Sequence, residues 1–179
     1  MMTVSLFELS IPTFLQTVRS IGACLDKAVA HCAENGTDPD DFVEARLVSE
    51  MAPFWFQTEC LDNYSVWGMV AIRNGAITPP DLVGAVPFAK LRSRMLNTET
   101  ALAAFEPDEA NAWSAKRLDM KIHTNPETLA FTSENYLMSF LLPNFYFHAV
   151  TAYDILRARG VPIGKSDFEG QETIHLIVS

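Results

Sequence analysis

Clusters of basic residues, long apolar runs and paired cysteines are all missing from this chain of 179 residues. Its 13 lysines and arginines are scattered among 22 acidic residues, which gives a net charge of −9. That balance argues against nucleic acid and anionic membranes as partners, because both attract basic surfaces. No apolar stretch reaches the roughly 18 residues that a membrane-spanning helix needs. We therefore expect no nucleic acid and no membrane among its partners.

The three cysteines, Cys24, Cys32 and Cys60, are odd in number and form no CxxC pair. The first ten residues lack the basic segment and apolar run that mark a secretory leader. Both observations indicate a reducing compartment, so we expect a cytoplasmic protein. The sequence also contains no Ser-His-Asp arrangement, P-loop or dinucleotide fingerprint, and its motifs leave open whether it is an enzyme.

Helical periodicity dominates what is present. Apolar residues recur at steps of three and four over four stretches. These stretches lie near 11–34, 50–74, 87–105 and 133–159. Strict alternation near 117–132 predicts a β-hairpin between the third and fourth stretches. The sequence therefore predicts one mainly all-α domain over 1–179, an up-and-down four-helix bundle with a small hairpin. Its core spans 7–170, and 171–179 form a tail.

The fourth stretch holds His148, a histidine inside a buried helical pattern. Asn144 and Thr151 share with it a partly polar stripe beside the apolar face. Pro143 removes a backbone donor and clashes with the preceding turn, so it predicts a kink or break near Leu142. A buried histidine can be a core residue bonded to one neighbour or part of a site, and the pattern leaves both interpretations open.

The second stretch is mostly apolar, but Thr58, Asp62 and Ser65 form a polar stripe along it. Glu59 and Asp62 lie three residues apart and could share a site on one helix face. The alternative for this pair is a solvated edge of the bundle.

Three motifs resemble those of an uncharacterised bacterial family of unknown function. They are Ala45-Arg46-Leu47 followed by Met51, Pro53 and Gln57; PNFYFH at 143–148 followed by TAY at 151–153; and GKSDFEG at 164–170. The likeness extends from Phe7 to Gly170. That family is similar to the DinB/YfiT-like superfamily of four-helix bundles, so the resemblance implies this fold.

The resemblance also implies what to seek in a site. DinB-like members often bind zinc or nickel through three histidines, one from the second helix and two, four residues apart, from the fourth. Some are thiol-dependent transferases or isomerases. Here Asn144 and Ala152 flank His148 at that spacing, and Ser65 stands near the position of the second-helix histidine. The three-histidine set is therefore not encoded, and no cofactor is predicted. His148, Asp62 and Glu59 remain weak candidates for a mixed divalent-metal site.

Three hypotheses follow. The favoured one is a bundle that binds a small molecule or a partner in an interhelical cavity, whose candidate residues are His148, Asn144, Tyr153, Asp62, Ser65 and Lys165. The second is a metal- or thiol-dependent transferase or hydrolase with an altered ligand set, in which His148 is a ligand or general base. The third is a purely structural or interaction protein with His148 in the core.

Two further expectations concern surfaces. Trp55, Trp67, Tyr146 and Phe147 exceed the aromatic content that one bundle core needs, which predicts a homodimer. The segment 164–170 shows no regular period, and its Phe168 should anchor it on the bundle. Lys165 then belongs either to a structural clasp or to a lid that offers its charge to an anionic ligand near His148.

Overall fold

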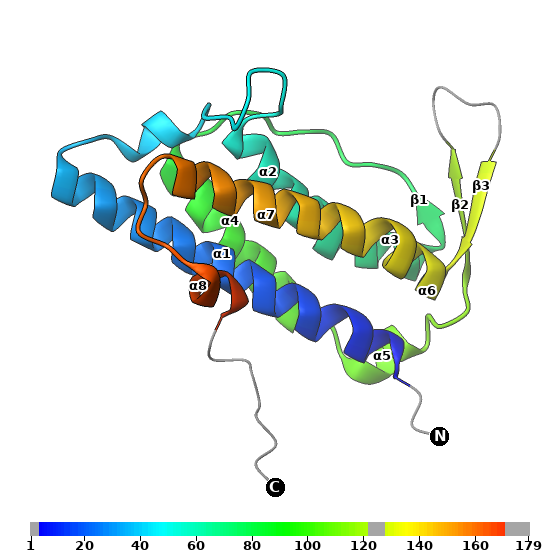
Figure 1. Ribbon diagram of the computed structural model, residues 1–179. Coiled ribbons are helices and arrows are strands. Elements are labelled where there is room, and N and C mark those ends of the chain that lie inside the picture. Colours follow the sequence, from blue (N-terminus) through cyan, green and yellow to red (C-terminus); the bar gives the residue numbers. More distant parts are fainter. Residues whose placement is uncertain (1–3, 122–127, 171–179) are drawn as a thin grey trace, which may run out of the picture.

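Four long helical rods form the body of the protein in the computed structural model, which describes residues 4–121 and 128–170 (Figure 1). The rods are α1 (Leu6–Asn35), α2–η2–α3 (Phe54–Asp62, Asn63–Trp67, Gly68–Asn74), α4 (Phe88–Ala103) and α6–η3–α7 (Ser133–Tyr136, Leu137–Leu141, Leu142–Ala158). The shorter elements are η1 (Pro39–Phe42), β1 (Ala76–Ile77), α5 (Pro107–Asn111), β2 (Arg117–Lys121), β3 (Thr128–Thr132) and α8 (Lys165–Glu169). The predicted fold class and the predicted hairpin are confirmed. The predicted tail lies outside the described residues.

The first helix begins five residues earlier than its apolar pattern predicts. Ser5 caps it by accepting from the Glu8 N–H, and the Glu8 carboxylate accepts from the Ser5 N–H at 2.8 Å. This capping box satisfies two donors at the helix start. Pro12 consequently lies inside the helix, where its ring faces solvent.

Two of the rods contain a π-helical turn, η2 in the second and η3 in the fourth. Turns of this kind insert one extra residue into an α-helix and recur at functional sites. The η3 turn ends two residues before Pro143, so the predicted irregularity near Leu142 is present as a π-turn in a continuous rod. The two π-turn rods approach closely, because a Cβ on Gly68 would lie 2.7 Å from the Leu141 side chain.

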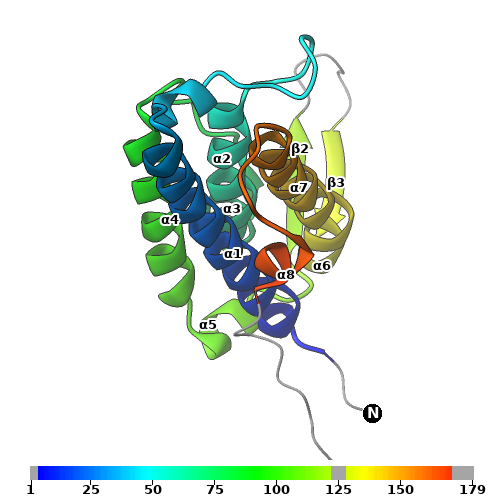
Figure 2. The same cartoon turned by 60° about the vertical axis from the view of Figure 1, so that its left-hand side comes forward.

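The order of packing follows from which rods touch. Both α1 and α2 pack against α4 and against α7, so α1 and α2 lie diagonally (Figures 1 and 2). The alternating direction predicted from the sequence holds from α1 to α2 and from α4 to α7. The α2–α3 rod and α4 instead run the same way, because the chain crosses back along the bundle between them (Figure 1).

This return segment, residues 78–87, is called the strap. Phe88 at the start of α4 stacks on Phe54 at the start of α2, with ring centroids 5.9 Å apart. The chain between the two helices must therefore recover the length of the α2–α3 rod, about 31 Å at 1.5 Å per residue. Thirteen residues, 75–87, are available for this and can span about 43–47 Å when fully extended. The connection is long enough without a helix, and the strap contains no helix or strand.

A three-stranded sheet of order β1-β2-β3 lies at one end of the bundle. β2 and β3 form the predicted hairpin with Leu118 opposite Phe131. β1 pairs with β2 in parallel, Ile77 opposite Met120, and was not predicted because two residues carry no period. This pairing fixes the first end of the strap to the sheet.

Aromatic and aliphatic side chains fill the space between the rods. Phe14 of α1 meets Phe145 of α7 edge to face at 4.8 Å, and both are fully buried. Among the described residues, no helix has the length and apolar character that crossing a membrane requires.

The 164–170 segment was predicted to be irregular, but it contains the short helix α8 packed on α1 (Figure 2). The Gly164 N–H donates to the Asp167 carboxylate at 2.7 Å at the start of this helix. The spacing of apolar residues gives no sign of such a local polar bond. Asp167 also pairs with Lys27 of α1 at 2.5 Å, and Phe168 meets Tyr153 of α7 edge to face. These contacts make α8 a clasp that ties the end of the described chain to two rods.

Replacing Phe168 by alanine should lower the free energy of unfolding by about 2 kcal/mol. This is less than the roughly 3–5 kcal/mol that truncating a fully buried phenylalanine costs, because the Phe168 ring is only partly buried. Lys165→Ala is the matched control. Its side chain is 87% exposed, so we expect a change within about 0.5 kcal/mol. Urea denaturation of both variants measures this, and equal losses would contradict the clasp.

Candidate functional site

His148 lies on the buried face of α7 and is hydrogen-bonded to Gln57 of α2. Its Nδ1 is 2.7 Å from Oε1 of Gln57, and the amide nitrogen of Gln57 donates to the carbonyl of Ala52 at 2.9 Å. Because Oε1 can only accept, Nδ1 carries the proton in the neutral ring. Nε2 then keeps its lone pair, and it makes no hydrogen bond to any residue that the structure describes.

Three aromatic rings surround this imidazole. Tyr64 stacks on it in parallel at 5.5 Å, and the edges or faces of Phe56 and Phe147 lie 5.7 and 5.2 Å away. Burial among these rings lowers the pKa of His148 to about 4. His148 is therefore neutral at physiological pH.

The other predicted site residues point in several directions. Asp62 accepts from the hydroxyl of Thr98 on α4 at 2.8 Å, and the Ser65 hydroxyl donates back to the carbonyl of Leu61. Asn144 donates to the carbonyl of Phe140 in its own rod. None of these contacts reaches His148.

Tyr153 and Lys165 belong to the clasp region. The Tyr153 ring contacts Phe168, and Lys165 pairs with Glu169 at 3.0 Å while its side chain stays in solvent. The lid interpretation of Lys165 is therefore wrong. The short helix docks on α1 and leaves the Lys165 side chain 87% exposed, paired with Glu169 of the same helix.

Glu59 lies on the α4 side of the second rod, away from His148. Its carboxylate accepts from the N–H groups of Val83 and Gly84 in the strap at 2.6 and 3.3 Å, and it pairs with Arg94 of α4 at 3.5 Å. It is only 3% exposed.

These positions do not fit the divalent metal that the fold family implies. Glu59 and Asp62 are engaged with the strap and α4, while His148 faces Gln57. Across 4–121 and 128–170, no group of three or more His, Cys, Asp or Glu side chains could hold a metal ion.

A thiol nucleophile is equally unsupported by the environment of the cysteines. Burial raises the pKa of Cys60 to about 12, with the Glu59 charge adding to the effect, and burial raises that of Cys24 to about 11. Reactive cysteines need the opposite shift, because the thiolate is the nucleophile.

A pocket of about 320 Å³ opens between the second rod, the fourth rod, the sheet and the strap. We call it the strap pocket. Its lining residues are Phe56, Cys60, Asn63, Tyr64, Trp67, Ile77, Pro79, Pro80, Leu82, Met120 and Phe140. Both π-turns contribute to it, η2 through Asn63, Tyr64 and Trp67 and η3 through Phe140. The polar side-chain groups of the lining are one amide, one phenol, one indole N–H and one thiol, all of them uncharged.

The polar groups around the strap pocket are held neutral. Burial raises the pKa of Tyr64, and also that of Tyr136, whose ring stacks on Phe140 at 5.4 Å. The Tyr136 hydroxyl is fully buried and has no hydrogen-bond partner within the described part of the chain. A buried group of this kind needs an explanation such as water or a ligand.

Of this lining, only Cys60 and Trp67 stand out in the sequence, Cys60 as an unpaired cysteine and Trp67 as a candidate for the surface of a homodimer. The strap residues Pro79, Pro80 and Leu82 lie in a segment without periodicity, so nothing in the pattern shows that they fold over the second rod. The one available signal was the concentration of aromatic residues at 54–67, where Phe56, Tyr64 and Trp67 recur at steps of three and eight.

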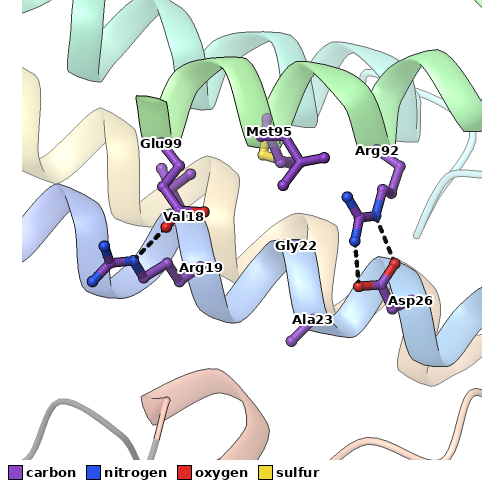
Figure 3. Close-up of a pocket in the computed structure, with 9 residues that line it drawn as sticks. Val18, Arg19, Gly22, Ala23, Asp26, Arg92, Met95 and Glu99 are labelled. Atoms are coloured by element: carbon purple, nitrogen blue, oxygen red, sulfur yellow. Dashed lines mark hydrogen bonds and ion pairs between the residues drawn. The ribbon is translucent and has the colours of Figure 1, made fainter. Parts of the chain in front are cut away.

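A second cavity, of about 180 Å³, lies between α1 and α4 (Figure 3). Arg92 binds both carboxylate oxygens of Asp26 at one end, and Arg19 binds Glu99 at the other at 2.7 Å (Figure 3). Because all four charges are already paired across the groove, they leave none for a ligand. The strap pocket is the better candidate.

The buried neutral histidine makes stability depend on pH. The unfolded chain binds a proton at the usual pKa of 6.5, whereas folded His148 does so only at about 4. Stability is therefore lost as the pH falls from 6.5 towards 4, by about 2 kcal/mol between pH 7 and pH 5. Urea denaturation should show this loss in wild type and in a His31→Asn control but not in His148→Asn. Equal losses in all three would contradict the assignment.

Comparison with known proteins agrees with this architecture. Residues 6–169 match the family described as "Domain of unknown function (DUF1993)". A crystal structure of a DinB family member protein from Shewanella denitrificans is similar, with a TM-score of 0.78, 25% sequence identity and 92% of each chain covered. No curated protein matches the chain. The resemblance predicted from the PNFYFH and GKSDFEG motifs is thus confirmed, and the chain belongs to the DUF1993 family, a domain of unknown function with a DinB-like fold.

Proposed function

We propose that this protein binds a small, uncharged molecule with one or two flat rings in the strap pocket. The observation that carries the proposal is the lining itself: four aromatic rings, no charged side chain, and a volume near the lower end of ligand sites, which run from roughly 300 to 1,000 Å³. Flat rings suit the stacking geometry that Phe56, Tyr64, Trp67 and Phe140 offer. The Asn63 amide can fix orientation through a hydrogen bond.

Protonation states support binding in preference to catalysis. A general acid or base works best with a pKa near the ambient pH. The His148 imidazole and the Cys60 thiol titrate at about 4 and about 12, so neither exchanges a proton readily at neutral pH. In this proposal His148 has a positioning role, since its bond to Gln57 and its stack on Tyr64 hold one wall of the pocket.

We further propose the cytoplasm as the place where this binding occurs. All three cysteines are free thiols, which supports a reducing compartment.

The uncharged fluorescent amine N-phenyl-1-naphthylamine is a suitable probe. We expect it to bind with a dissociation constant of about 1–100 μM, because an apolar pocket excludes water from its rings. Leu82→Asp places a charge at the pocket wall and should weaken binding at least tenfold, about 1.4 kcal/mol. Leu82 is 51% exposed, so the substitution should not unfold the protein.

The matched control is Leu96→Asp. Leu96 is 48% exposed and lines the groove between α1 and α4, so the same change there should leave probe binding intact. Fluorescence titration measures both variants. Equal weakening, or no binding by the wild type, would overturn the proposal.

A second proposal concerns assembly. Met138, Leu142, Tyr146 and Val150 follow one another at steps of four along the outside of the fourth rod, with Phe147 beside them. Tyr146 and Phe147 are 39% and 57% exposed. We propose that this apolar ridge packs against a second copy of the chain in a two-fold homodimer. In a protein of net charge −9, a ridge without charged residues is the face on which two copies repel least.

Light scattering should give a mass of about twice the 19.9 kDa chain for the wild type. Val150→Glu buries a charge in the proposed interface and should yield a monomer. Val29→Glu on α1 is the control, because Val29 is 43% exposed and Val150 41%. A monomeric wild type would refute the homodimer.

A further inference from the structure

The strap is attached to the bundle by very few polar contacts. From Thr78 to Val86, no backbone group bonds to another backbone group in the described part of the chain. Its ends are fixed, at Ile77 through the sheet and at Phe88, whose N–H donates to Asp40 at 2.7 Å. From Thr78 to Val86, the bonds to Glu59 are its only hydrogen bonds to the described residues outside it.

The Glu59 carboxylate binds the middle of the strap through hydrogen bonds. Two successive N–H groups, from Val83 and Gly84, donate to the two oxygens of its carboxylate. Gly84 has φ +90, a conformation that L side chains rarely adopt. Arg94 pairs with the same carboxylate from α4, which compensates its buried charge.

The part of the strap just before these two hydrogen bonds also forms one wall of the strap pocket. Pro79, Pro80 and Leu82 line the pocket just before Val83 in the chain. Cys60 lines it from the helix position next to Glu59. Opening this wall would expose little new apolar surface beside these hydrogen bonds, because Leu82 and Val83 are already 51% and 69% exposed. Segments held by so few buried contacts are the ones that open locally.

We propose that the strap is the gate of the strap pocket and that the Glu59 carboxylate is its latch. The gate opens when the bonds to Val83 and Gly84 break, and the fixed ends return the strap to the same closed position. This inference rests on the proposed function for its ligand. The latch itself can be tested without one.

The ligand-free test is alkylation of Cys60 by N-ethylmaleimide, followed by peptide mass spectrometry. Val83→Pro removes the donor of the shorter latch bond and leaves Glu59 and Cys60 untouched. We expect Cys60 to react at least tenfold faster in this variant, while Cys24 and Cys32, buried on α1, keep their wild-type rates and exclude general unfolding. Ala85→Pro is the control, since the Ala85 N–H donates to no other described residue.

Glu59→Gln should give the same acceleration from the helix side of the latch. Burial raises the pKa of Cys60 and the Glu59 charge adds to that effect, so this variant also makes the thiol more reactive and has to be compared with Val83→Pro. Faster alkylation in Glu59→Gln with an unchanged rate in Val83→Pro would overturn the gate, as would equal acceleration in Ala85→Pro.

Stopped-flow binding of N-phenyl-1-naphthylamine separates the gate from the pocket. We expect Val83→Pro to raise the association rate at least threefold over wild type. Probe binding with equal association rates in the two proteins would overturn the gate and leave the pocket. Faster alkylation of Cys60 without probe binding in either protein would overturn the proposed function and leave the gate.

Discussion

The return of the chain along the bundle is the constraint on which the rest of the structure depends. Because the α2–α3 rod and α4 run the same way, the chain between them must recover about 31 Å outside the rods. The strap makes no backbone–backbone hydrogen bond to another described residue between Thr78 and Val86, so its N–H groups bond to solvent unless the rods supply an acceptor. Glu59 supplies it, which explains a carboxylate only 3% exposed in a mostly apolar helix.

The strap pocket follows from this crossing. A strap laid over the second rod cannot fill the space beside it as a helix would, since it presents prolines and one leucine. The two π-turns shape the opposite walls, and the close approach of Gly68 to Leu141 holds the rods that carry them together. The hollow is thus a consequence of bundle topology together with local helix geometry.

The neighbourhood of His148 shows how a DinB-like bundle is stabilised without the three-histidine set. Gln57 satisfies Nδ1, and the rings of Phe56, Tyr64 and Phe147 enclose the imidazole. The polar residues of the second rod turn instead to α4 and the strap, where Thr98 and Arg94 meet them. The polar residues of the second rod therefore join it to α4 through hydrogen bonds and an ion pair that stabilise the packing of the two rods.

Local pattern alone determined the four rods and the hairpin. A helix or strand that buries one face repeats its apolar residues about every 3.6 or every 2 positions, and this repeat is visible in the sequence. It also predicted the disturbance before Pro143 and the anchoring of Phe168. It could not tell on which side of the second rod Glu59 and Asp62 would lie, since one helix offers neighbours on both flanks. Nor could it place the strap, two-residue β1 or the short helix α8, which have no period. Those were decided by which rods touch, and with them the pocket, the latch and the hydrogen bond that His148 makes to Gln57.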